Sequence, residues 1–284
     1  MEGALSDGGL RIVSAASVSL EEFAAALTAA FSGYHFPLSL DAAGLARKVR
    51  FEQIDLQQSL FAREGAEAVG VAALAIRGWA GWVAGFGVVP VRRGQGVGRS
   101  LMAALLERAR ACGLRRLSLE VLAQNAAARR LYEGAGMRVA RELLLLERAG
   151  VAVADSGAPG SSPLRDAAPA ELLPHFARLH RVAPAWQRDL PSLLTGRSRG
   201  LYLGEKARPE AYALLSEGPN GNFLSDLAAP DAERASELCA ALGSVAVAGT
   251  LKVINEPEQS LFAGPLLAHG FVETGRQHEM VMEL

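Results

Sequence analysis

Apolar residues recur at intervals of three and four positions in two segments of the first half of the chain, residues 20–31 and 97–111. This spacing places them on one face of a helix, so we predict a helix over each segment. Ser19 precedes the first segment and can cap it, while Gly113 follows the second at a position where helices commonly end. A shorter helix is predicted over residues 126–134.

Apolar runs, some with alternating polar residues, predict the strands of the first half. Glu64 and Gly65 mark the turn of a hairpin. A long strand interrupted by glycines precedes the helix over 97–111, and a pair of strands at 137–147 closes the half. The other predicted strands are 10–14, 59–63, 68–77, 79–89 and 117–122.

The second half repeats this order loosely. Its predicted strands are 201–204, 211–216, 223–227 and 251–255, and its predicted helices are 232–242 and 260–269. The ending Gly270-Phe271-Val272-Glu273 parallels Gly136-Met137-Arg138-Val139. We infer an internal repeat. The alternation of strands and helices predicts an α/β or α+β fold for each half.

A stretch rich in Gly, Ser and Pro separates the two halves, which is the composition of a linker. We therefore expect two domains, residues 1–150 and 164–284, joined by a linker over 151–163. The chain length of 284 residues is sufficient for two domains, each with its own core.

The composition is that of an ordinary globular protein, with 50% hydrophobic and 21% charged residues. The longest apolar stretch, near residues 81–91, is too short to span a bilayer, and the N-terminus lacks the pattern of a signal peptide. No membrane partner is expected. Cys112 and Cys239 fall in different predicted domains, so we expect no disulfide framework and a cytoplasmic location.

The net charge of -1 gives no general nucleic-acid footprint, and no nucleic-acid partner is expected. The charge is uneven, however. Residues 1–150 hold 18 Lys and Arg against 14 Asp and Glu, whereas the remainder holds 11 against 16. The first half therefore suits an anionic ligand better, although chance variation between two solvated surfaces is an equal explanation.

A glycine-rich turn joins a predicted strand to a predicted helix at residues 88–99, Val-Val-Pro-Val-Arg-Arg-Gly-Gln-Gly-Val-Gly-Arg. The start of a helix presents free N–H groups and the positive end of its dipole, and glycine lets a ligand approach them. With arginines nearby, this turn suits a diphosphate. It lacks the Gly-Lys-Ser/Thr of a P-loop, and a G-x-G-x-x-G pattern fails at Arg99 and Leu101.

The same turn, with the strand before it, matches the R/Q-x-x-G-x-G/A signature of the GCN5-related N-acetyltransferases (GNAT). Residues 119–137 resemble the family's later motif, N-x-x-A-x-x-L-Y-x-x-x-G-F, with Met137 in place of the usual Phe. The resemblance covers most of residues 10–148. It implies an α+β fold with two GNAT-like domains in tandem, each a mixed, mostly antiparallel sheet flanked by helices, and acetyl-CoA as the co-substrate.

The resemblance also implies which residues hold acetyl-CoA. In this family the strand before the turn is splayed from its neighbour, so its backbone groups can pair with the pantetheine arm. Gly85 and Gly87 fit a bulge there. Asn125 would bond the same arm, cap the following helix, or do both. The implied residues are Phe86, Gly87, Val88, Arg93, Gly94, Gln95, Gly96, Val97, Gly98, Arg99 and Asn125.

Acyl transfer from a thioester to an amine needs a group that removes a proton, one that stabilises an oxyanion, and one that protonates the sulfur. Tyr132 is the candidate acid, because a phenol can donate a proton without being charged and the family places this tyrosine beside the CoA sulfur. Glu120 is the candidate base, since its spacing from Tyr132 resembles that in ribosomal-protein N-terminal acetyltransferases. A packing tyrosine and an ion-paired or exposed glutamate are the alternatives.

The acceptor site is less well marked. The family frames it with the segment after the first helix, which contains Tyr34 and His35 here, and Trp79 and Trp82 are further candidates. Packing is the alternative role for these aromatic residues. We expect the primary amine of a small molecule as acceptor; a protein N-terminus or lysine is the alternative. A non-catalytic acyl-CoA sensor is the alternative of another class. No metal is expected, and monomer or homodimer stays open.

The second half lacks the R-x-x-G-x-G pattern. Counting back from Gly270 without gaps puts Leu266 in the place of Tyr132 and Ile254 in the place of Glu120. Asp231, at the start of the predicted helix, would oppose a diphosphate. We therefore expect a degenerate acetyltransferase-like domain that packs on the first or shapes its acceptor site, with an unrelated α/β domain as the alternative.

Overall fold

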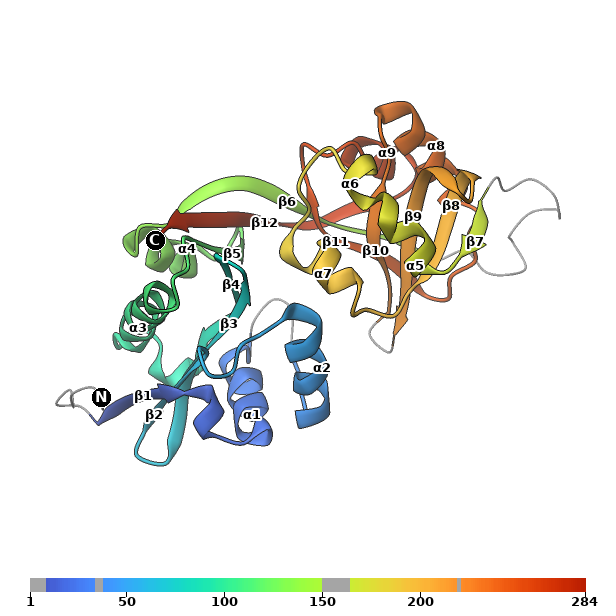
Figure 1. Cartoon of the computed structure of the whole chain (residues 1–284). Coiled ribbons are helices and arrows are strands. Elements are labelled where there is room, and N and C mark those ends of the chain that lie inside the picture. Colours follow the sequence, from blue (N-terminus) through green and yellow to red (C-terminus); the bar gives the residue numbers. More distant parts are fainter. Residues whose placement is uncertain (1–8, 34–37, 150–163, 219–220) are drawn as a thin grey trace. The chain divides into compact units, whose positions relative to one another are not determined.

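The computed structural model describes residues 9–33, 38–149, 164–218 and 221–284 (Figure 1). The chain forms two compact units: unit 1 consists of Met1–Ala140 and Glu279–Leu284, and unit 2 of Arg141–His278. This division differs from the expected boundaries at residues 150 and 164. Each change of unit falls inside a strand and not in the predicted linker. The predicted linker over 151–163 lies outside the described residues.

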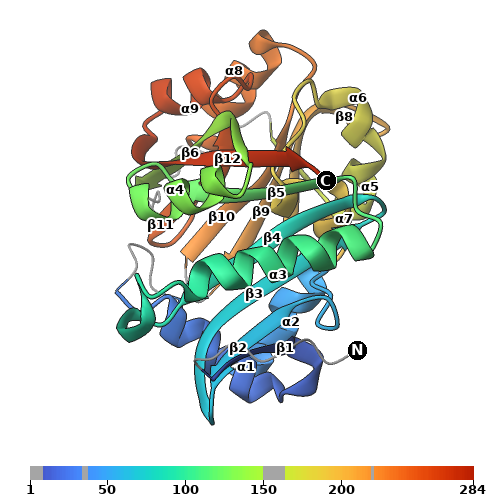
Figure 2. The same cartoon turned by 90° about the vertical axis from the view of Figure 1, so that its left-hand side faces the viewer.

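Unit 1 is a sheet with helices on both faces (Figure 2). The strand order is β1-β2-β3-β4-β5, followed by the end of β12 (Val272–Glu283). Pairing is antiparallel from β1 to β4 and parallel between β4 and β5. Its strands are β1 (Leu10–Ser14), β2 (Leu60–Glu64), β3 (Glu67–Arg77), β4 (Ala80–Val88) and β5 (Arg116–Leu122), and its helices are α1 (Leu20–Ala30), α2 (Ala42–Glu52), α3 (Val97–Ala111) and α4 (Ala126–Gly134).

The predicted helices of unit 1 are confirmed. Ser19 caps α1 by accepting a hydrogen bond from the Glu22 N–H at 3.1 Å. The apolar faces of α1 and α3 are buried, with Leu27 and Leu101 fully inaccessible. Helix α2 was not predicted, although Asp41 caps it in the same way as Ser19 caps α1.

The expected pair of closing strands at 137–147 is wrong. A single strand, β6 (Arg138–Ala149), covers this segment and continues into unit 2. Unit 1 takes its last strand from the end of the chain instead: Met280 and Met282 are buried in its core, and the Leu284 N–H donates to the Arg115 carbonyl at 2.9 Å. The pattern of apolar residues could not reveal which segment β6 pairs with.

Unit 2 has the strand order β6-β11-β10-β9-β8-β7. Strands β10 and β11 are parallel, and the pairs β11·β6, β10·β9, β9·β8 and β8·β7 are antiparallel. Besides β6 and the first part of β12, its strands are β7 (Arg165–Ala167), β8 (Arg199–Glu205), β9 (Arg208–Gly218), β10 (Gly221–Ala228) and β11 (Thr250–Pro257). Its helices are α5 (Pro169–Leu172), α6 (Phe176–Leu179), α7 (Leu190–Leu193), α8 (Ala232–Leu242) and α9 (Ala263–Ala268).

Alternation along β8 and β9 creates a core on each face of the unit 2 sheet. Leu201 and Ala213 pack in the cluster that contains residues of α8 and α9, whereas Tyr202 and Tyr212 pack in the cluster under α5, α6 and α7. The predicted repeat is confirmed in the order of elements. In the described segments, none of the helices is long and apolar enough to span a membrane.

Candidate active site

The sheet of unit 1 opens between β4 and β5. In the described chain these two strands pair in parallel at three positions, and the pair of Trp82 with Ser118 is the last. Beyond this pair β4 continues to Val88 and β5 to Leu122, and the strands separate. The edge of β4 at Phe86, Gly87 and Val88 therefore faces a gap in the sheet, as the family resemblance implies.

Glycines in β4 let helix α1 approach the sheet. A β-carbon on Gly87 would lie 2.8 Å from that of Ala30, and one on Gly85 would lie 3.2 Å from the Leu27 side chain. The register of β3 and β4 shifts at this point, with Ala84 as the extra residue of a bulge. Packing against α1 thus explains both glycines, and the bulge lies where they occur.

The glycine turn leaves the start of α3 without a side-chain cap. Gly94 and Gly96 have φ of +76° and +90°, in the region that favours glycine, and Gly96 is the N-cap. A β-carbon on Gly96 would meet no protein atom within 4 Å. The first-turn N–H groups, beginning at Val97, therefore point toward an accessible site for an anion. Gly98 is different, because a β-carbon there would make ordinary contacts.

The arginine and glutamine of the turn hold the backbone in place. Arg93 donates to the carbonyls of Val88 and Ala30 at 3.0 and 2.9 Å, which ties the turn to the ends of β4 and α1. Gln95 donates to the Val91 carbonyl at 2.9 Å. Arg99 lies exposed on the first turn of α3. The side chains of Arg93 and Gln95 thus shape the turn, and Arg99 supplies the exposed positive charge.

Helix α4 brings Tyr132 against the separated part of β4. The Tyr132 side chain is buried, with 6% exposure, and its ring meets that of Phe86 edge to face at 5.9 Å between centroids. Asn125 caps α4, because its side-chain oxygen accepts a hydrogen bond from the Ala128 N–H at 3.1 Å. The cap uses only the oxygen of the Asn125 amide, so capping and ligand binding are compatible.

Glu120 and Trp82 meet from the two separating strands. The indole N–H of Trp82 donates to the Glu120 carboxylate at 2.7 Å. Trp82 is buried, and the Lys48 ammonium lies 6.0 Å from its ring centroid. Trp82 therefore orients the carboxylate of Glu120, and its role at the acceptor stays a prediction.

Two charged residues of α2 were missed by the sequence analysis because the helix itself was missed. The Lys48 ammonium pairs with the Glu52 carboxylate at 2.6 Å, next to Trp82. Burial raises the pKa of Glu52, and the charge and hydrogen bond of Lys48 oppose this increase. Asp41, an N-cap residue at the start of α2, was the available signal.

Trp79, the other described acceptor candidate, does not join this group. Trp79 is 58% exposed, and its carbonyl accepts from the Arg115 N–H at 2.8 Å at the paired end of β4 and β5. It is therefore separated along β4 from the opening. Tyr34 and His35 lie outside the described residues.

Unit 2 has a corresponding separation of strands, with a different helix start. Pairing between β10 and β11 is recorded for two residue pairs, the second being Phe223 with Lys252. Helix α8 begins after Asp231, whose carboxylate accepts a hydrogen bond from the Arg234 N–H at 2.9 Å. This carboxylate takes the position that an anionic ligand would need.

Comparison with known proteins identifies the class. Residues 22–137 match the model of the Acetyltransferase (GNAT) family. A stretch of 53 residues is 45% identical to the uncharacterized N-acetyltransferase YycN of Bacillus subtilis (strain 168). The match covers 19% of this chain and 34% of that protein, so it spans about a third of the curated relative. The matched segment lies in unit 1, which is therefore similar to the GNAT family of acetyltransferases, acyltransferases that generally use acetyl-CoA.

Solved structures extend the likeness in fold to both units. A GCN5-related N-acetyltransferase from Sphaerobacter thermophilus has a TM-score of 0.70 at 15% identity, over 99% of this chain and 97% of its own. A tandem GNAT protein from the clavulanic acid biosynthesis pathway has a TM-score of 0.63 at 16% identity, over 96% and 98%. The expected fold of two GNAT-like domains in tandem is thereby confirmed.

Proposed function

We propose that unit 1 transfers the acetyl group of acetyl-CoA to a primary amine, expected to be that of a small molecule. The observation that carries the proposal is the convergence of three features on the opening between β4 and β5. These are the uncapped start of α3, Tyr132 packed on Phe86, and Glu120 held by Trp82.

The residues around the opening fit the parts of acetyl-CoA. The N–H groups at Val97 and Gly98 would hold the diphosphate, with Arg99 adding positive charge. The β4 edge at Phe86, Gly87 and Val88 would pair with the pantetheine arm, and Asn125 would reach the same arm. When bound, acetyl-CoA supplies an acetyl group activated as a thioester.

Two side chains would handle protons. Glu120, oriented by Trp82, would accept the proton that the attacking amine loses. Tyr132 would hold a proton at its hydroxyl oxygen for the departing sulfur, since its buried ring is fixed against Phe86. Backbone N–H groups near Phe86 would stabilise negative charge on the reacting carbonyl oxygen.

Release of free CoA thiol across a panel of amines tests this function and its alternatives. The panel contains small primary amines, a peptide with a free N-terminus and a peptide with an internal lysine. Thiol release that depends on a small amine supports the proposal, whereas release only with a peptide favours a protein acceptor. Binding of acetyl-CoA without release for any amine would indicate an acyl-CoA sensor.

Glu120→Gln refines the assignment of the base. The variant should turn over more slowly near neutral pH, and its deficit should shrink at high pH, where the free amine no longer needs a base. A deficit that is the same at every pH would assign Glu120 a role in structure or binding instead.

A further inference from the structure

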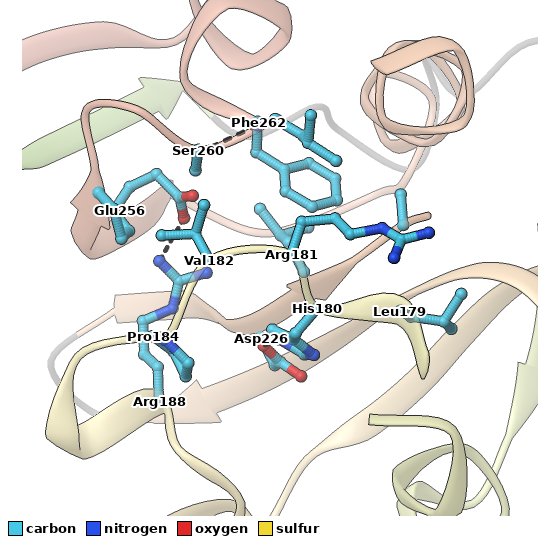
Figure 3. A pocket seen from close by; sticks show the side chains of 14 residues that line it. Leu179, His180, Arg181, Val182, Pro184, Arg188, Asp226, Glu256, Ser260 and Phe262 are labelled. Carbon is cyan, nitrogen blue, oxygen red and sulfur yellow. Dashed lines mark hydrogen bonds and ion pairs between the residues drawn. The ribbon is translucent and has the colours of Figure 1, made fainter. Parts of the chain in front are cut away.

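A pocket opens in unit 2 where β10 and β11 separate (Figure 3). Asp226 of β10 and Glu256 of β11 line it, together with His180, Arg181 and Arg188 from the segment that follows α6. All of its lining residues belong to unit 2. The carboxyl ends of separating parallel strands are a general ligand position in open sheets, so the pocket lies where the fold can hold a molecule.

His180, which is partly buried, forms an ion pair with the buried Asp226. The Asp226 carboxylate accepts from the His180 Nε2–H at 3.0 Å and from the Tyr212 hydroxyl at 2.8 Å. The other ring nitrogen of His180 lies 3.0 Å from the Phe176 carbonyl, which is also an acceptor. Both nitrogens face acceptor oxygens, an arrangement that favours the doubly protonated ring. Burial alone would lower the pKa of His180, but the hydrogen bond and charge of Asp226 outweigh it and raise the pKa above its ordinary value.

Arg188 and Glu256 form a second ion pair, in which both residues are buried. Arg188 is 7% exposed, and its Nε–H has no hydrogen-bond partner, which leaves a costly unpaired donor at the pocket. Ser260 accepts from the N–H groups of Phe262 and Ala263 at 3.1 and 3.2 Å, so its own hydroxyl proton stays available to donate. The two groups left without a partner among the described residues, the Arg188 Nε–H and the Ser260 O–H, are therefore both hydrogen-bond donors.

The charges of the pocket leave one net positive charge. The two ion pairs cancel, and Arg181 is the additional cation. Its Nε–H donates to the Pro230 carbonyl at 2.8 Å, and the residue is exposed. Val182, Leu227 and Phe262 supply apolar walls. An amine would find both carboxylates already committed, and a phosphate dianion would exceed the single net charge.

We propose that unit 2 binds a small monocarboxylic acid with an apolar body in this pocket, its carboxylate held by the unpaired Nε–H side of the Arg188 guanidinium and the hydroxyl of Ser260, with Arg181 supplying the net positive charge. Guanidinium groups match a carboxylate with parallel hydrogen bonds, and the unpaired Nε–H of Arg188 gains an acceptor. The apolar body then contacts Val182 and Phe262.

The proposal is tested by titrating the full-length protein with 3-methylbutanoate. Binding is measured from the chemical shifts of backbone amides in nuclear magnetic resonance spectra. The expected result is saturable binding that shifts the signals of Arg181 and Ser260. Equimolar 3-methylbutylamine and inorganic phosphate, which serve as probes of opposite charge and of higher charge, should each bind at least about tenfold more weakly.

Two variants localise the site. Arg188→Gln combined with Glu256→Gln removes both buried charges together, so neither is left unpaired, and should weaken 3-methylbutanoate at least about tenfold. Arg181→Gln changes an exposed residue and should also weaken it, which keeps the test valid if the double variant does not fold. Arg197→Gln, an exposed arginine outside the pocket, should leave binding unchanged.

Three results would overturn the proposal. These are the absence of saturable 3-methylbutanoate binding, equal binding of the amine, and undiminished binding in Arg181→Gln. The experiment is independent of acetyl transfer by unit 1, so its failure would leave the proposed function of unit 1 intact.

Discussion

Unit 1 and unit 2 separate a pair of parallel strands at the same place in the strand order, but different chemistry surrounds the two openings. In unit 1 the next helix, α3, begins at a glycine with no side-chain cap. In unit 2 the next helix, α8, begins at Asp231, which caps it with a carboxylate. The first helix start can therefore accept an anion, whereas the second already carries one.

The side chains at the openings differ in the same sense. Unit 1 has Tyr132 and Glu120 at the opening, each in contact with an aromatic residue of β4. Unit 2 has buried Leu266 on α9 and ion pairs centred on Asp226 and Glu256. The fold thus supplies an opening in both units, and a few residues at its rim determine which ligand each one suits.

The largest expected effect concerns Tyr132. Tyr132→Phe keeps the ring and its contact with Phe86 but removes the proton, so the chemical step should slow by about 10²–10⁴-fold while acetyl-CoA affinity changes little. Pre-steady-state thiol release and equilibrium binding measure the two quantities. Tyr202→Phe, a buried tyrosine of unit 2, is the matched control. A Tyr132→Phe protein that turns over at the normal rate would make Tyr132 a packing residue.

Because the end of β12 supplies the last strand of unit 1, we expect a large effect on stability from changes there. Met280→Ala should lower the free energy of unfolding by about 2–5 kcal/mol, because Met280 is fully buried in the core of unit 1. Urea denaturation measures this change. Val272→Ala, at an exposed position on the same strand, should cost much less. Equal costs for the two variants would be incompatible with the end of β12 as a core strand.

A smaller effect is expected at Asp231. Asp231→Ala removes the cap of α8 and should cost about 0.5–2 kcal/mol of unfolding free energy, while Asp231→Asn keeps the cap and most of the stability. Neither variant should gain a second acetyl-CoA site, since the glycine turn is still missing. Acetyl-CoA binding at unit 2 in Asp231→Ala would mean that the carboxylate alone distinguishes the two helix starts.

The smallest effect is a pH dependence of stability. Because the folded-state pKa of His180 is raised above its ordinary value of about 6.5, the folded state binds more protons than the unfolded state between the two values. Its stabilising contribution is therefore complete below about pH 6.5 and is lost as pH rises through the folded pKa. Denaturation at pH 6 and pH 8 should show a smaller difference in His180→Gln than in the parent; an unchanged difference would contradict this assignment.

The sequence predicted the elements whose signals are local. The spacing of apolar residues located α1 and α3, and Ser19 marked the start of α1. The glycine turn identified the open helix start, because positive φ at Gly94 and Gly96 requires glycine. These features depend on neighbouring residues and were therefore readable without a structure.

Features that depend on distant residues were not predicted. The pairing that gives unit 1 its last strand links β5 with the end of the chain, which no local pattern encodes. The pocket lined by Glu256 was not predicted, because counting without gaps compared unit 2 with the unit 1 site only at Leu266 and Ile254. The bulge between Val253 and Glu256, in which Asn255 adopts a φ of +59°, depends on pairing with a distant strand and was not predicted either. The hydrogen bond from Trp82, an acceptor candidate, to Glu120 joins two strands and was not predicted either.

The central claim, that one acetyl-CoA binds per chain at the uncapped start of α3, is tested most directly by titration calorimetry on the full-length protein. Gly96→Ala is the control, because it carries the same backbone strain at positive φ as Gly96→Asp but no charge. Its methyl group would meet no protein atom within 4 Å. Gly96→Asp adds a carboxylate as in α8 and should weaken binding beyond Gly96→Ala by about 1–3 kcal/mol. The account predicts one site in the parent protein and this loss in Gly96→Asp; two equivalent sites, or the same affinity in both variants, would contradict it.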